Sequence, residues 1–111
     1  MAPTLTTEIV PGPRPIVRVA GELDLSTAAR LCQGIQQAIR GPRPRVVIDL
    51  TDVTFCDSTG LRALLGAVRE VEVQGGKAKL VIVPGSALDR LLYLTGLREF
   101  ADVAESANLV V

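Results

Sequence analysis

The chain contains no histidine and no tryptophan, and aromatic residues make up only 3% of its 111 positions. Without histidine, the general base of the usual serine hydrolases and the usual Cys/His zinc site are both missing. Few aromatic rings also mean that no basic stretch is interleaved with side chains on which nucleobases stack. Because 48% of the residues are nevertheless hydrophobic, we expect an aliphatic core of Val, Leu, Ile and Ala.

The sequence also lacks a net charge, since 12 Lys and Arg residues balance 12 Asp and Glu residues. No overall field is available to hold nucleic acid or an anionic membrane surface, so nucleic acid is not an expected partner. We interpret the cluster of Arg40, Arg43 and Arg45 as a solvated loop. The carboxylates are scattered and form no ligand-like motif, so neither a metal site nor a cofactor is expected.

Long apolar runs are absent too. None approaches the ~18 residues that a membrane helix needs, and the first four residues do not resemble a signal peptide. We therefore expect a soluble, cytoplasmic protein without membrane insertion. Cys32 and Cys56 are too few for a disulfide framework and are interpreted as small core residues. The length predicts one domain over 1–111, with 1–4 as a flexible N-terminus and 105–111 as a tail without an assigned structure.

What is present is an alternation of strand and helix patterns. Strands are expected at 5–10, 16–20, 46–50 and 77–83. Helices are expected from Asp24 to about Ile39, over about 58–73, and between Ser86 and Gly96, with Leu25 on the apolar face of the first. This order predicts an α/β fold, with a mixed, mostly parallel sheet of four or five strands and three or four helices mainly on one face.

Three helix starts carry polar residues. Asp24, Ser58 and Ser86 each follow a predicted strand, so we expect them to meet at one edge of the sheet. Ser58 falls at the N-cap or in the first turn of its helix, where backbone N–H groups are unpaired and the macrodipole is positive. That setting favours an exposed hydroxyl. The neighbouring Asp57 is either an N-cap or a source of negative charge facing a partner, and both interpretations stay open.

A serine between a strand and a helix is also found in hydrolases. Their nucleophile elbow reads G-x-S-x-G, whereas Cys56 occupies the first glycine position of this sequence. With histidine absent as well, the chain is not expected to be an enzyme and no catalytic residue is assigned.

Four segments resemble, in order and spacing, the signatures of STAS domains, particularly those of bacterial anti-sigma factor antagonists. They are Gly21–Ala28, Val46–Leu50, Phe55–Gly60 and Leu94–Phe100, within a likeness that spans about residues 5 to 104. The resemblance implies a domain without catalytic activity and a serine that a partner kinase phosphorylates. Carried onto this chain, that serine is Ser58, with Thr59 as an alternative acceptor.

The expected function is that of an anti-sigma factor antagonist. The unphosphorylated form binds an ATP-dependent anti-sigma factor serine kinase and releases the sigma factor, and phosphorylation of Ser58 blocks this binding. A serine phosphatase is a further candidate partner, and a weak homodimer is a further candidate assembly. The alternative is a STAS scaffold or accessory subunit of a stress-signalling or lipid-transport complex. The residues predicted to bind the partner are Asp24, Asp57, Ser58, Thr59, Gly60, Arg62, Ala63 and Gly66.

Overall fold

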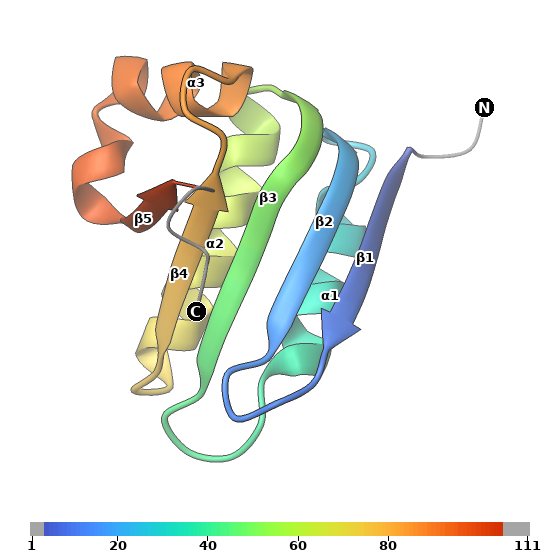
Figure 1. Cartoon of the computed structure of the whole chain (residues 1–111), viewed down its shortest axis with the longest axis vertical. Helices are drawn as coiled ribbons and strands as arrows, with labels where there is room; N and C mark the ends of the chain where they lie inside the picture. Colours follow the sequence, from blue (N-terminus) through green and yellow to red (C-terminus); the bar gives the residue numbers. More distant parts are fainter. Residues whose placement is uncertain (1–3, 106–111) are drawn as a thin grey trace.

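A computed structural model describes residues 4–105, whose strands form one sheet in the order β1-β2-β3-β4-β5. β1 and β2 pair antiparallel, and the remaining neighbours pair parallel. Figure 1 shows two helices behind the sheet and a third at the end where β4 stops. The predicted mixed, mostly parallel sheet is confirmed. The elements are β1 (Leu5–Val10), β2 (Ile16–Leu23), α1 (Ala28–Ala38), β3 (Arg45–Cys56), α2 (Ser58–Val73), β4 (Lys77–Ile82), α3 (Ala87–Thr95), the 3-10 helix η1 (Leu97–Phe100) and β5 (Asp102–Glu105).

The core lies between the sheet and the helices and is aliphatic, as expected. Alternate residues of β2 and β3 point into it, because successive side chains of a strand face opposite sides of the sheet. α2 adds residues at helical spacing. Fully or nearly fully buried members from these three elements are Val17, Val19, Val46, Ile48, Leu50, Leu61, Leu64, Val68 and Val71. The position of α2 over the sheet is therefore fixed by packing along most of its length.

Strand and helix bounds agree with the sequence to within one residue except in three places. β2 continues to Leu23, three residues past the predicted end. β3 continues to Cys56, six residues past the predicted end. α1 begins at Ala28 with Thr27 as its N-cap, so the prediction that Asp24 caps this helix is wrong. Leu25 consequently lies before the helix, where its side chain is 77% exposed instead of contributing to the core.

The C-terminal third follows its predicted signals. The Ser86 side chain accepts a hydrogen bond from the Asp89 N–H at 3.2 Å, and Gly96 ends α3 with φ of 73°. Val103 lies in the short strand β5, which pairs with β4. At the other end of the chain, the carbonyl of Thr4 accepts from the Glu22 N–H at 3.1 Å, so Thr4 is tied to β2. The rest of the predicted flexible N-terminus and the tail after Glu105 lie outside the described residues.

Within residues 4–105, no helix combines the length and the apolar character that a membrane span requires.

Candidate functional site

The ends of β2 and β3 bring two of the three predicted polar segments together. Leu23 pairs with Cys56 at the end of the parallel ladder, and the Asp57 N–H donates to the Leu23 carbonyl at 3.3 Å. β4 stops earlier, because its ladder with β3 ends at the pair Asp49 and Val81. The segments that carry Asp24 and Ser58 are therefore adjacent. Ser86 follows a strand end that is not level with theirs, so the predicted meeting of all three is only partly correct.

Asp57 caps α2. Its Oδ1 atom accepts from the Gly60 N–H at 2.8 Å, which pairs one of the backbone donors that every helix leaves free in its first turn. Gly60 is buried, and a Cβ at this position would meet the backbone carbonyl group of Leu23, within 2.6 Å of its carbon. Gly60 therefore seats the helix on β2 and offers no side chain to a partner.

Ser58 is the first residue of α2, and both Ser58 and Thr59 are exposed. Neither hydroxyl takes part in a hydrogen bond with another residue of the described part of the chain. The Ser58 hydroxyl is thus exposed and not engaged by the described part of the chain. It also lies at the positive end of a sixteen-residue helix, where a negative charge is stabilised by the macrodipole and the unpaired N–H groups.

Asp24 organises the loop that follows β2. Its Oδ1 atom accepts from the Ser26 hydroxyl at 2.7 Å, from the Ser26 N–H at 2.9 Å and from the Thr27 N–H at 3.2 Å. These hydrogen bonds, led by the one from the Ser26 hydroxyl, hold the pKa of the Asp24 carboxyl below its usual value, although partial burial acts in the opposite direction. Asp24 is therefore charged at neutral pH and shapes its own loop.

Thr27 was missed by the sequence reasoning. It is a buried polar side chain, only 1% exposed, and its hydroxyl donates to the Glu22 carbonyl at 2.8 Å while accepting from the Asp24 N–H at 3.0 Å. The signal was available, because Asp24 is followed two and three residues later by Ser26 and Thr27, and such residues are typical of turns closed by side-chain oxygens. Thr27 fixes the loop between β2 and α1 from inside the protein.

Two exposed apolar side chains flank the serine segment, and the sequence analysis assigned neither to the site. Leu25 is 77% exposed in the loop after β2, and Phe55 is 46% exposed near the end of β3. Exposed apolar side chains beside charged groups are typical of protein-binding surfaces. We call this surface the docking edge; it comprises Asp24, Leu25, Phe55, Asp57, Ser58 and Thr59.

The outer side of α2 continues from the docking edge. Arg62 and Gly66 are exposed and Ala63 is half-buried. Ala63 and Gly66 line a groove of about 380 Å³ between α1 and α2. The predicted contacts on this helix thus divide into an exposed charged residue and two small residues that form the wall of a groove.

The Cys56 thiol lies under the docking edge and is buried. Burial, with a smaller contribution from the negative charge of Asp57, raises its pKa to about 11. Such a thiol is protonated at neutral pH and is a poor nucleophile. Within residues 4–105 no three Cys, Asp or Glu side chains gather as metal ligands would.

Comparison with known proteins identifies the family to which this sequence and fold are similar. The model of the family described as "Mlab, STAS domain" matches residues 10–109. The anti-sigma-B factor antagonist of Bacillus subtilis is 36% identical over 93 residues, covering 83% of each chain. The corresponding protein of Staphylococcus aureus is 27% identical and covers 84% of this chain and 85% of its own.

Solved structures agree with these sequence matches. An anti-sigma factor antagonist from Mycobacterium paratuberculosis superimposes with a TM-score of 0.76 at 30% identity, covering 90% of this chain and 85% of its own. The phosphorylated form of Bacillus SpoIIAA, at 23% identity, shares the fold with a TM-score of 0.64 and covers 92% of this chain and 90% of its own. The family match spans nearly all of the described residues, and the chain belongs to the STAS domain family.

Proposed function

We propose that this protein is an anti-sigma factor antagonist whose binding to an anti-sigma factor is switched off by phosphorylation of Ser58. The observation that carries the proposal is the free, exposed hydroxyl of Ser58 at the first position of α2. The names of the Bacillus subtilis and Mycobacterium paratuberculosis relatives support the same function. The partner is proposed to be a serine kinase that uses ATP, and the chain itself is proposed to bind without catalysing a reaction.

The physical basis of the switch is a change of charge on a surface that is desolvated when the partner binds. The unmodified docking edge presents Leu25 and Phe55 around a small neutral hydroxyl. A phosphate brings about −1.5 to −2 charges and a strongly held hydration shell to that point. Asp57 already adds a negative charge beside it, so a partner surface that fits the unmodified edge meets both a desolvation cost and repulsion.

No rearrangement of the fold is needed for this switch. The Gly60 contact with Leu23 and the Asp57 cap hold the start of α2 in place, and neither uses the Ser58 side chain. The helix N-terminus stabilises a phosphate on the free protein. The modified protein is therefore expected to stay folded while its affinity for the partner falls.

The assignment of Ser58 is tested with the purified kinase and ATP. Mass spectrometry should place one phosphate on Ser58, and Ser58→Ala should take up none while still binding the anti-sigma factor. Ser58→Asp should bind more weakly than the wild type. Thr59→Ala is the matched control, because it removes the neighbouring exposed hydroxyl, and it should be phosphorylated normally. Phosphate on Thr59 with Ser58 unmodified would refute the assignment.

A second candidate function is that of a permanent scaffold or accessory subunit. The specific observation in its favour is that the matching family model carries the name Mlab and not that of an anti-sigma factor antagonist. The two functions differ in reversibility. Size-exclusion chromatography with partner and ATP should show a complex that dissociates upon phosphorylation, whereas an accessory subunit would stay in a larger assembly under both conditions.

A further inference from the structure

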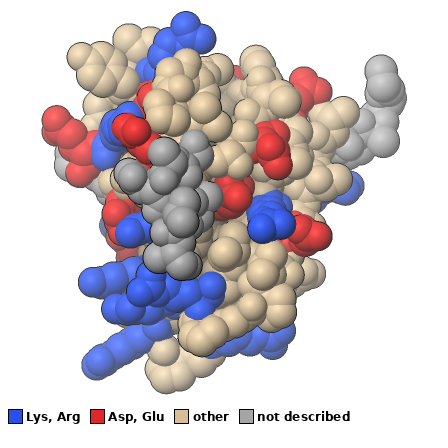
Figure 2. Space-filling model, in the orientation of Figure 1, with Lys and Arg blue, Asp and Glu red and all other residues tan. Residues whose placement is uncertain are grey.

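A second surface lies at the opposite end of the molecule, where β3 and β4 begin. Half of the 12 basic residues of the chain gather there, and Figure 2 shows the blue side chains concentrated at this end. All six are exposed. We call this surface the basic end; its residues are Arg14, Arg40, Arg43, Arg45, Lys77 and Lys79, which line two hollows that share Arg45.

Among residues 4–105, one carboxylate lies at the basic end, because Asp102 lines the second hollow and is the register partner of Lys79. The ion pairs found among residues 4–105 join Arg18 to Glu8 and Arg98 to Asp89 and Glu105, and none involves a residue of the basic end. Arg45 and Lys77 are register partners on adjacent strands. Like charges directly opposite each other destabilise a sheet, so the isolated chain keeps an unfavourable arrangement that an anionic partner would relieve.

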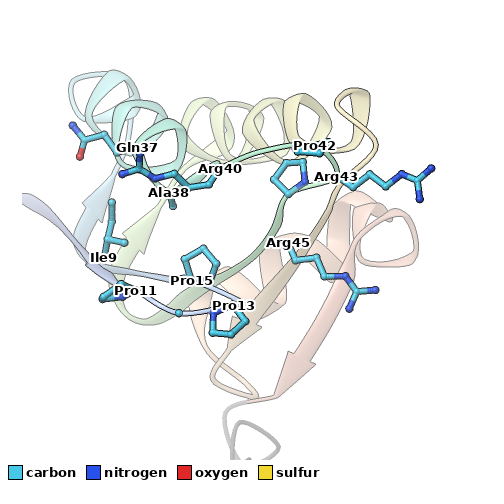
Figure 3. Close-up of a pocket in the computed structure, with 12 residues that line it drawn as sticks. Ile9, Pro11, Pro13, Pro15, Gln37, Ala38, Arg40, Pro42, Arg43 and Arg45 are labelled. Atoms are coloured by element: carbon cyan, nitrogen blue, oxygen red, sulfur yellow. The ribbon is translucent and has the colours of Figure 1, made fainter.

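A preformed hollow adds shape to this charge. It encloses about 520 Å³ between the β1–β2 loop and the loop that leads into β3. In Figure 3, Pro11, Pro13 and Pro15 form one wall, Ala38 and Pro42 lie across from them, and the Arg43 and Arg45 side chains extend outward. Proline fixes φ, so the wall does not need to be ordered when a ligand binds.

The backbone at Arg43 is the third observation. Arg43 has φ of 55°, the left-handed region that glycine adopts most easily, and it is the only described residue other than glycine with a positive φ. Such a conformation costs about 1 kcal/mol or more for a residue with a side chain. An arginine stands where glycine would fit better, which is typical of functional positions.

We propose that the basic end binds an extended acidic segment of a partner protein. Carboxylates of the segment pair with the arginines and lysines, and an apolar side chain enters the proline-walled hollow. Nucleic acid fits less well, because the described residues that line the two hollows include no aromatic side chain to stack with bases. A membrane surface fits less well, because the apolar groups line a concavity, whereas insertion needs projecting apolar side chains.

This second interaction is independent of the proposed Ser58 switch. Arg45 begins β3 and Cys56 ends it, so the two surfaces lie at opposite ends of one strand. A partner on the basic end leaves the docking edge free. The chain can therefore link two proteins, of which only one is released by phosphorylation.

The test uses a fluorescein-labelled peptide in which Glu and Leu alternate, and fluorescence anisotropy with the full chain. The double variant Arg43→Gly/Arg45→Gln should bind about tenfold more weakly than the wild type. It should fold at least as well at position 43, because glycine relieves the left-handed backbone. Arg30→Gln/Arg90→Gln removes the same charge from exposed positions elsewhere and should leave the affinity unchanged. Ser58→Asp should leave it unchanged as well.

No measurable binding of the peptide to the wild type would overturn the proposal, and so would any of three further results. The first is an equal loss of peptide affinity in both double variants. The second is equal binding of a peptide with Gln in place of Glu, which would show that carboxylates are not recognised. The third is tighter binding of a single-stranded oligonucleotide or of phosphatidylglycerol vesicles than of the peptide, which would assign the basic end to a different class of partner.

Discussion

Two glycines of α2 differ in whether their surroundings leave room for a side chain. Gly60 packs on the Leu23 carbonyl group, whereas a Cβ at Gly66 would meet no atom within 4 Å. We predict that Gly60→Ala lowers the free energy of unfolding by roughly 1–3 kcal/mol, because backbone atoms must move apart. Gly66→Ala should raise it by about 0.5–1 kcal/mol, since alanine favours the helix interior. Urea unfolding measures both, and equal effects of the two substitutions would contradict the close contact.

The Cys56 thiol gives a residue-scale prediction on pH. With Cys32→Ser as background, Ellman's reagent should leave Cys56 unmodified in the folded protein at about pH 8, where ordinary thiols are already partly ionised. Reaction should accelerate only as the pH approaches the raised pKa of about 11. Burial favours the neutral thiol, so the folded state loses stability as the pH rises from the ordinary thiol pKa towards this value. Rapid modification near pH 8 would show that the thiol is accessible.

Residue roles were predictable where the local pattern has one meaning. The change from a strand to a helix pattern indicated that Ser58 begins a helix with an exposed hydroxyl, and Ser58 is the exposed first residue of α2. Of the two interpretations of Asp57, the N-cap is the one that its hydrogen bond with the Gly60 N–H shows. Leu25 was misplaced because apolar spacing cannot distinguish a helix face from a loop that precedes it. The packing of Gly60 on Leu23 depends on residues 37 positions apart, a contact that no local pattern contains.

At the scale of elements, the start of α2 depends on its cap. Asp57→Ala should lower the free energy of unfolding by about 1 kcal/mol, because the Gly60 N–H loses its acceptor. Asp57→Asn should cost less, since asparagine caps nearly as well while removing the charge. Thermal unfolding of both variants separates the hydrogen bond of the cap from the effect of the negative charge on the helix. An equal loss in Asp57→Asn would mean that the charge, and not the cap, stabilises the helix.

A helix with a clear capping residue at its start and glycines after its end was predicted almost to the residue. α2 begins after Asp57 and ends before Gly75 and Gly76, as the sequence indicated. α1 differs because Asp24 and Thr27 close a separate turn before the helix, so a capping residue was present but capped something else. β3 runs further than predicted because its second half continues to pair with β2 after its pairing with β4 has ended.

At the scale of the whole molecule, the absence of net charge hides a separation of charge. The chain sums to +0, yet the basic end carries six exposed cations and the docking edge carries Asp24 and Asp57. Composition argued against nucleic acid and an anionic membrane surface, whereas the fold gathers basic residues of two loops and of the first residues of β3 and β4 onto one end. The parallel sheet places this end and the docking edge at opposite ends of the same strands.

The most direct test is isothermal titration of one anti-sigma factor with the unmodified protein and with the protein phosphorylated on Ser58. We predict that the phosphate weakens binding by at least about tenfold, with unchanged far-UV circular dichroism. Equal dissociation constants for the two forms, with the phosphate verified on Ser58, would contradict the electrostatic switch.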